Sequence, residues 1–210
     1  MATQKRLVIA VDCDDVLVPT ARHIIDDYNE RFGTQMGFEH FYDTTDASLD
    51  VWGVTTRNEA IERVAEFLHT DKHAQIVPEA DAIAAIRLLA EDHELHLVSG
   101  RVDTLKPVTE HMLQTYFPDC FQTIEHTNFI APLSTKVVRR SKGDICRSIG
   151  AHMLIDDHPH HTANALSANI DRVILFGDYD WNRSEAEHEK MIRCKDWSSV
   201  LQEVSLYAAG

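Results

Sequence analysis

The sequence predicts an α/β fold with a Rossmann-like parallel sheet as its core and a small helical cap inserted after the first strand. Short apolar runs rich in β-branched residues recur along the chain, and helical stretches lie between them. This alternation is typical of a parallel sheet covered on both faces. The 210 residues, 44% of them apolar, suffice for one substantial core and a small inserted module.

Four apolar runs are predicted to be strands, at residues 7–11, 94–98, 152–155 and 172–176. Asp12 follows the first run, Ser99 the second, and Asp156 the third. The carboxyl ends of parallel strands meet at one edge of a sheet, and ligands bind in the crevice outside them. We therefore expect these three residues, which are distant in sequence, to share one crevice.

Helices are expected at residues 78–92, which begin with a proline, at 142–149, which stop at Gly150, and at 197–207, with an apolar face. Residues 21–32 and 58–68 also look helical, but they interrupt the regular alternation of strands and helices. Residues 19–77 are therefore assigned to the cap. Residues 1–18 and 78–210 are assigned to the core.

The formal charge of −14 argues against nucleic acid polymers as partners, because no basic excess is available to replace counterions. An anionic small substrate would need a cation to approach such a chain. No apolar stretch reaches the roughly 20 residues that span a bilayer, and no signal peptide is evident. We expect a cytoplasmic protein that does not bind membranes, with four scattered free thiols; a homodimer is compatible with the sequence.

Candidate catalytic groups begin with Asp12 and Asp14 in the fragment VDCDDVL. Alone, this pair is equally compatible with an acidic turn or a helix cap. It is followed, in order, by Ser99 in LHLVSGR, Lys142 in SKGDIC, and Asp156 with Asp157 in MLIDD. Together these fragments resemble the four motifs of the haloacid dehalogenase (HAD) superfamily, and the resemblance covers nearly the whole chain.

Within that superfamily the chain resembles the 5′(3′)-deoxyribonucleotidase branch and its bacterial relatives. The residues that carry this likeness are Val16, the approach VPEADAI, the segment LFGDYDWNR at 175–183, and CKDW at 194–197. Asp15 departs from the pattern, since glycine is more usual there. The resemblance implies a phosphomonoesterase that acts on nucleoside monophosphates.

The resemblance also implies a role for each acid. Asp12 is the nucleophile, whose carboxylate can attack phosphorus to give an acylphosphate. Asp14 is the general acid/base, which protonates the leaving alkoxide and then deprotonates water. The cofactor is Mg²⁺, a hard cation that neutralises crowded carboxylates. Its ligands are the Asp12 side chain, the Asp14 carbonyl and Asp156, with Asp157 either ligating or orienting.

Candidate substrate contacts follow the second and third motifs. Ser99 offers a hydroxyl, and the chain through Gly100 and Arg101 leads toward a helix whose backbone N–H groups could meet a phosphate oxygen. Lys142 supplies positive charge for the nucleophile and the phosphoryl group. We prefer it to Lys136, which lies in a less regular stretch.

In the cap, Phe41, Tyr42 and Trp52 either stack on a base or pack the cap's own small core. We expect substrate contacts from Phe41 and Trp52, although core packing is the stronger alternative for Trp52. The histidines of DDHPHH (His158, His160, His161) are expected in an exposed loop broken by Pro159, without a transition metal.

The sequence is also compatible with three alternatives to a nucleotidase. The chain could be a HAD phosphatase for another small phosphorylated metabolite, or a non-catalytic relative that binds phosphate. A receiver-like phosphorylation switch uses similar residues on a similar sheet. The order of the motifs argues against the switch, because here an acidic pair, Asp156 and Asp157, follows the lysine.

Overall fold

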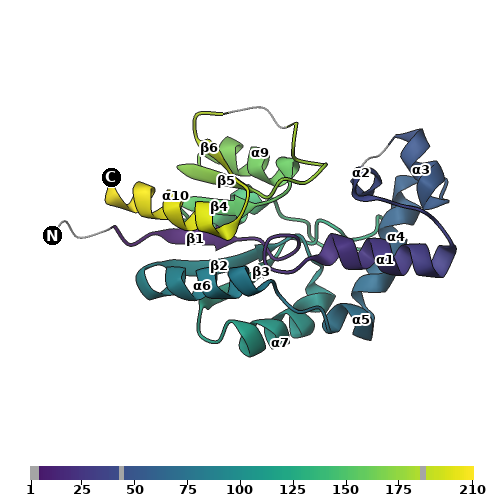
Figure 1. Cartoon of the computed structure of the whole chain (residues 1–210), viewed down its shortest axis with the longest axis horizontal. Coiled ribbons are helices and arrows are strands. Elements are labelled where there is room, and N and C mark those ends of the chain that lie inside the picture. Colours follow the sequence, from purple (N-terminus) through teal and green to yellow (C-terminus); the bar gives the residue numbers. More distant parts are fainter. Residues whose placement is uncertain (1–4, 43–44, 185–187) are drawn as a thin grey trace.

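The computed structural model describes residues 5–42, 45–184 and 188–210. Residues 1–4 and 185–187 of the predicted core and residues 43–44 of the predicted cap therefore lie outside the described part. Its centre is a parallel sheet of six strands in the order β3-β2-β1-β4-β5-β6 (Figure 1). The strands are β1 (Val8–Val11), β2 (Glu94–Ser99), β3 (Phe121–His126), β4 (Met153–Asp156), β5 (Arg172–Phe176) and β6 (Met191–Cys194). The predicted parallel α/β fold is confirmed.

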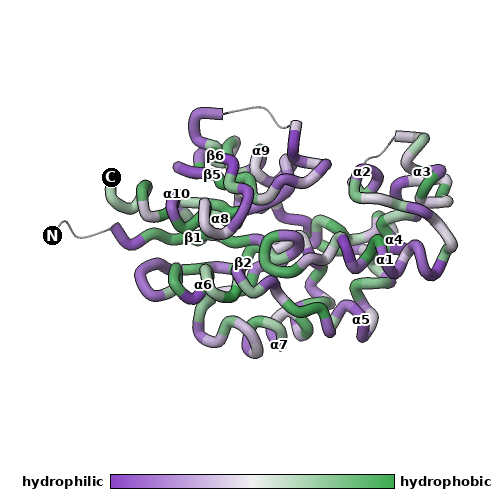
Figure 2. The backbone as a smooth tube through the Cα atoms, viewed as in Figure 1, coloured by the Kyte–Doolittle hydropathy of each residue, from purple (hydrophilic) through white to green (hydrophobic). Residues whose placement is uncertain are grey.

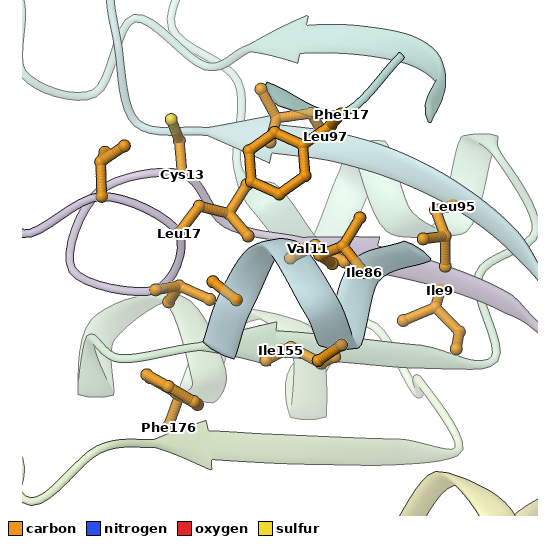
Figure 3. Packing of buried hydrophobic residues seen from close by; sticks show 14 of the residues in the cluster. Ile9, Val11, Cys13, Leu17, Ile86, Leu95, Leu97, Phe117, Ile155 and Phe176 are labelled. Atoms are coloured by element: carbon orange, nitrogen blue, oxygen red, sulfur yellow. The ribbon is translucent and has the colours of Figure 1, made fainter. Parts of the chain in front are cut away.

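Different helices cover the two faces of the sheet. Helices α6 (Ala80–Asp92), α7 (Lys106–Tyr116) and α10 (Trp197–Ala209) pack on the face that carries Ile9 and Val11. Helices α8 (Lys142–Ser148) and α9 (Pro159–Ser167) pack on the face that carries Ala10. Successive strand residues point to opposite faces, so one strand supplies both clusters. Figure 3 shows the first cluster, in which Leu17 and Phe117 lie over the strands.

Six helices separate β1 from β2, and the five before α6 form the insertion: α1 (Thr20–Phe32), α2 (Phe38–Phe41), α3 (Asp46–Trp52), α4 (Arg57–Leu68) and α5 (Asp71–Ala74). In Figure 1 they gather at the end of the molecule away from both termini. They enclose a small apolar cluster of their own that includes Tyr28 and Trp52. Because the strands run toward this end, the helices stand over the carboxyl edge of the sheet.

Local capping explains where several of these helices begin. At α4 and α5 a threonine, Thr56 or Thr70, accepts a hydrogen bond from the third backbone N–H of the helix. At α1 the preceding Pro19 provides no such bond, and the carboxylate of Asp15 accepts from the N–H of Ala21 instead, at 3.0 Å. The first helix of the insertion is therefore tied to the loop that carries Asp12 and Asp14.

The predicted strands and helices agree with the structure, but two strands and the helices α2, α3, α5, α7 and α9 were missed. The missed strands, β3 and β6, are the two edges of the sheet. An edge strand is covered less completely, and β3 accordingly has only partly buried or exposed side chains until His126. Neither strand shows the continuous apolar run of the four inner strands. The short 3₁₀ helix η1 (Asp103–Leu105) precedes the missed α7.

The expectation for the DDHPHH segment was wrong in two respects. Pro159 does not break the segment but is the first residue of α9, a position where its missing N–H costs nothing. His161, in the first turn of that helix, is buried rather than exposed. The sequence of such a short fragment does not distinguish a proline that begins a helix from a proline that interrupts a loop.

Hydrophobic residues concentrate along β1 and its neighbours in the interior (Figure 2). Among the described residues, no helix combines the length and the apolar character needed to cross a membrane. The four cysteines are buried free thiols, as expected.

Candidate active site

Three carboxylates meet where β1 and β4 end side by side. Asp12, Asp156 and Asp157 are buried, and each places a carboxylate oxygen within 4.8 Å of the others. The two strands are held in register here because the N–H of Asp12 donates to the carbonyl of Ile155 at 3.0 Å. The topology therefore converts two distant sequence fragments into one acidic cluster.

Lys142 lies between two of these carboxylates. Its Nζ is 2.7 Å from Asp12 Oδ1 and 2.7 Å from Asp156 Oδ2, and the side chain is 0% exposed. Burial alone would lower the pKa of this ammonium, but the two carboxylates outweigh burial and raise it. Lys142 is therefore charged, whereas its rival Lys136 is exposed.

The position of Lys142 depends on a close approach of α8 to α9. Ser141 caps α8 by accepting from the N–H of Asp144, and Gly143 faces α9. A Cβ on Gly143 would lie 2.4 Å from the carbonyl oxygen of Asn164, closer than any side chain tolerates. Glycine next to the lysine thus lets the start of the helix reach the strand ends.

The three carboxylates carry more negative charge than one ammonium can balance. Burial raises the pKa of Asp12 to about 7, although Lys142 opposes the shift. Burial and the charge of Asp156 raise the pKa of Asp157 well above its ordinary value. Buried oxygen donors with an excess of negative charge are what a small divalent cation requires, so this donor set fits Mg²⁺.

Asp14 lies in a different environment from its neighbours. Arg101 donates to it through both arms, Nε to Oδ2 at 2.9 Å and Nη2 to Oδ1 at 2.8 Å, and the hydroxyl of Thr20 also donates to Oδ1. Burial would raise the pKa of this carboxyl, but Arg101 and Thr20 hold it well below its usual range. Two acids that are two residues apart thus differ sharply in proton affinity.

Arg101 is expected from the sequence to contact substrate, but its guanidinium is occupied within the protein. The remaining arm, Nη1, donates to Thr109 on α7 at 3.0 Å, and the residue is 3% exposed. Nothing in the sequence of LHLVSGR reveals that this arginine would pair with Asp14. In the structure it orients the candidate acid/base.

Ser99 and Gly100 lie at the end of β2, next to β1. Ser99 is fully buried, and its Oγ accepts from the backbone N–H of Arg101 at 3.2 Å. Within the described residues, the Ser99 hydroxyl proton has no acceptor. A Cβ on Gly100 would make only ordinary contacts, at 3.8 Å or more, so steric crowding does not explain this glycine.

A cavity of about 260 Å³ lies between the strand ends and the helical insertion. Phe41 and Trp52, the two aromatic residues expected to contact substrate, both line it. Trp52 is nevertheless only 3% exposed, and its indole N–H donates to the carbonyl of His40 at 3.1 Å. It therefore packs the small core of the insertion and is also one of the residues that line the cavity.

Trp181 and Asn182 were not among the candidate site residues, yet both hold Asp157. The indole N–H of Trp181 donates to Asp157 Oδ2 at 2.8 Å, and the amide of Asn182 donates to the Asp157 carbonyl at 2.9 Å. The Trp181 ring stacks on Tyr179, with centroids 4.5 Å apart. The fragment DYDWNR contains these residues, but nothing in it indicates that they reach the third motif.

Asp15 is a second unexpected participant. Its φ of +58° is uncommon for a residue with a side chain, and its carbonyl accepts the hydroxyl of Tyr179 at 2.8 Å. Together with the bond to Ala21, these contacts pin the turn that follows Asp14. Asp15 is also one of the residues that line the cavity described above.

Comparison with known proteins relates the chain to others only through its fold. No protein-family model matches the sequence, and no curated protein does. Among solved structures, a haloacid dehalogenase-like hydrolase from Streptococcus pneumoniae is 12% identical with a TM-score of 0.64, covering 96% of this chain and 98% of that one. A predicted phosphoglycolate phosphatase from Haemophilus somnus is 13% identical with a TM-score of 0.61, covering 97% and 99%.

A third similar structure is a magnesium-bound HAD hydrolase from Bacillus subtilis, which is 11% identical with a TM-score of 0.59, covering 96% of this chain and 99% of that one. At these identities the likeness establishes the fold and not the reaction. The chain has the fold of the HAD-type hydrolases over nearly its whole length. These similarities do not distinguish the deoxyribonucleotidase branch from other HAD-type hydrolases.

Proposed function

From a HAD-type fold with a buried carboxylate cluster at its strand ends, we propose that the chain is a magnesium-dependent phosphomonoester hydrolase. It acts through an aspartyl-phosphate on small phosphorylated metabolites, with (deoxy)nucleoside monophosphates as the specific candidates. The observation that carries this proposal is Lys142, which contacts both Asp12 and Asp156 at 2.7 Å inside the acidic cluster. A buried ammonium between two acids suits a dianionic phosphoryl group.

The carboxylates of Asp12, Asp156 and Asp157 and the carbonyl of Asp14 would hold the metal. When bound, Mg²⁺ supplies positive charge that neutralises the cluster and the phosphoryl oxygens. Lys142 adds a second positive charge beside the nucleophile, and the Ser99 hydroxyl donates to a phosphoryl oxygen. Each of these groups strengthens its contact as charge develops in the transition state.

In the first step, an Asp12 carboxylate oxygen attacks phosphorus, the bond from phosphorus to the leaving oxygen breaks, and Asp14 gives that oxygen a proton. In the second step, a water oxygen attacks the acylphosphate while Asp14 takes up the water proton. The bond between phosphorus and Asp12 then breaks, and inorganic phosphate leaves. Asp12 and Asp14 return to their starting protonation states.

The pairing of Asp14 with Arg101 places a condition on this cycle. Asp14 is ionised while Arg101 and Thr20 donate to it, so it is ready to act as a base. To act as an acid it must first hold a proton, which this pair disfavours. We expect substrate binding to loosen the Arg101 contact, because phosphoryl oxygens compete for the guanidinium.

Residues 19–77 would act as the cap that limits substrate size. Both ends of α4 contact the core: Asn58 Oδ1 accepts the N–H of Leu133 at 2.8 Å, and His69 Nε2 lies 2.9 Å from Thr104 Oγ1. These bonds hold α4 against the core beside the cavity, an arrangement suited to a small molecule. They argue against a macromolecular substrate.

A panel of nucleoside monophosphates, sugar phosphates and an aryl phosphate, assayed for phosphate release with and without Mg²⁺, tests the proposal. Magnesium-dependent release that is abolished in Asp12→Asn supports the chemistry. Preference for deoxynucleoside monophosphates supports the nucleotidase branch, and preference for another ester supports a different small metabolite. Folded protein that binds Mg²⁺ but releases no phosphate from any ester would favour a non-catalytic, phosphate-binding relative.

A further inference from the structure

The walls of the cavity are more apolar than its catalytic end. One face of α4 contributes Ala60, Ile61, Val64 and Leu68 at helical spacing. The other apolar lining residues come from four further segments: Ile24, Phe41, Tyr42, Leu49, Trp52, Phe129 and Ile130. Asp14 and Asp15, which follow the proposed nucleophile Asp12 in the chain, provide the acidic end of the cavity.

Several polar groups of the lining already have partners within the protein. The Thr20 hydroxyl donates to Asp14, the Trp52 indole N–H donates to a carbonyl, and the Asp15 carboxylate accepts from Ala21. A leaving group rich in hydroxyls would lose its hydrogen bonds to water and find few replacements here. A flat apolar group would instead contact the rings and aliphatic side chains of the walls.

Arg57, the first residue of α4, is the one cationic side chain among the lining residues. It is exposed, and within the described part of the chain no carboxylate forms an ion pair with it. Its neighbour Asn58 is fixed by the core loop, so the start of α4 is held at the cavity. Its guanidinium is thus available to an acceptor on a ligand.

We infer that the substrate is the phosphate ester of a flat, mainly apolar alcohol that carries a hydrogen-bond acceptor for Arg57. This inference rests on the proposed phosphatase function and specifies the leaving group. Aromatic and heteroaromatic alcohols with a carbonyl or carboxylate belong to this class, and polyols do not. A volume of about 260 Å³ is sufficient for one such ring system.

The test compares three esters whose leaving groups are all primary alcohols. These leaving groups differ more in apolar surface and charge than in intrinsic chemical reactivity. They are 2-naphthylmethyl phosphate, its 6-carboxylate derivative and glycerol 1-phosphate. With Mg²⁺ present, kcat/KM is expected to be at least about tenfold higher for the naphthyl esters than for the glycerol ester. The carboxylated ester is expected to be the best of the three.

Three variants separate the contribution of the cavity walls from that of Arg57. Ile61→Asn is expected to lower kcat/KM for both naphthyl esters about tenfold and to leave the glycerol ester unchanged, and the milder Val64→Thr is expected to act in the same direction. Arg57→Gln is expected to lower kcat/KM for the carboxylated ester alone. The matched control is Leu206→Asn on the exposed face of α10, outside the cavity, which is expected to change none of the rates.

Equal or faster hydrolysis of glycerol 1-phosphate by the wild type would overturn the inference. An equal loss for all three esters in Ile61→Asn and Val64→Thr would also contradict it. If no ester is hydrolysed, the proposed function fails separately, and calorimetric binding of 2-naphthylmethyl phosphate decides the inference. Binding weakened about tenfold by either wall variant supports it, whereas no binding by folded wild-type protein overturns it.

Discussion

The indole N–H of Trp181 donates to Asp157 Oδ2 at 2.8 Å, so a tryptophan from the loop after β5 fixes a carboxylate of the acidic cluster. The same ring lies edge-on to Tyr42 of the insertion, with centroids 4.8 Å apart. One side chain therefore contacts both the candidate metal site and the segment proposed as a cap. The orientation of Asp157 is coupled to the packing of that segment.

Trp181→Phe is expected to weaken Mg²⁺ binding about tenfold, because it removes the N–H that orients Asp157 and keeps an aromatic ring at the contact with Tyr42. Calorimetric titration of Mg²⁺ into the protein measures this directly. The matched control is Tyr28→Phe, which removes a hydroxyl bonded to the Trp52 carbonyl inside the insertion. It should lower Tm without changing Mg²⁺ affinity. Unchanged affinity in Trp181→Phe would show that Asp157 needs no such support.

Lys142→Met is expected to destabilise the metal-free protein by about 3–5 kcal/mol at pH 7, because it leaves Asp12 and Asp156 buried without their ammonium. Burial raises the pKa of both carboxyls. The folded variant therefore takes up protons more readily than the unfolded chain, and its deficit relative to wild type should shrink as the pH falls from 7 to 5.

Urea unfolding with a chelator present, at both pH values, measures that deficit. Lys136→Met, at an exposed position, serves as the control and should change the free energy of unfolding by no more than about 0.5 kcal/mol. A deficit for Lys142→Met that grows toward pH 5 would mean that the two carboxylates are not the source of the instability.

The inner strands and the clustering of their terminal residues were predictable because both depend on local patterns. A continuous apolar run predicts a covered strand, and the geometry of a parallel sheet then brings Asp12 and Asp156 to one edge. The edge strands β3 and β6 lack that pattern because one side of each has no neighbour. Their burial depends on tertiary contacts that the sequence does not display.

The supporting contacts of the site were not predictable for a related reason. Arg101 pairs with Asp14 from 87 positions away, and Trp181 reaches Asp157 across a loop. Such pairs depend on how side chains extend from elements already assembled, and no spacing rule in the sequence encodes them. The types of the site residues predicted the chemistry, whereas the side chains that hydrogen-bond to them could be identified only from the structure.

His73 makes the protein sensitive to mild acid. It is buried on α5, its Nδ1 has no hydrogen-bond partner within the described residues, and burial lowers its pKa to about 4. The unfolded chain, with a histidine pKa of about 6.5, binds the proton more tightly. The contribution of neutral His73 to the free energy of unfolding is therefore fully present above about pH 6.5. It is lost as the pH falls toward 4, by up to about 3 kcal/mol.

His73→Leu should accordingly lose less stability than wild type between pH 7 and pH 5 in urea unfolding. His111→Leu, at an exposed position on α7, is the control and should follow the wild-type curve. Parallel curves for wild type and His73→Leu would place the acid sensitivity elsewhere, for example at the buried His161.

Asp14→Asn should separate the two proposed chemical steps. With 4-nitrophenyl phosphate the leaving group departs without a proton, so the variant can still form the Asp12 acylphosphate. The attack of water, however, needs the carboxylate that Arg101 and Thr20 hold ionised in the native protein. Rapid mixing should thus give a burst of about one equivalent of nitrophenolate, followed by turnover reduced 10²–10⁴-fold. Asp12→Asn should give no burst, and steady turnover of Asp14→Asn near the wild-type rate would assign the base to another residue.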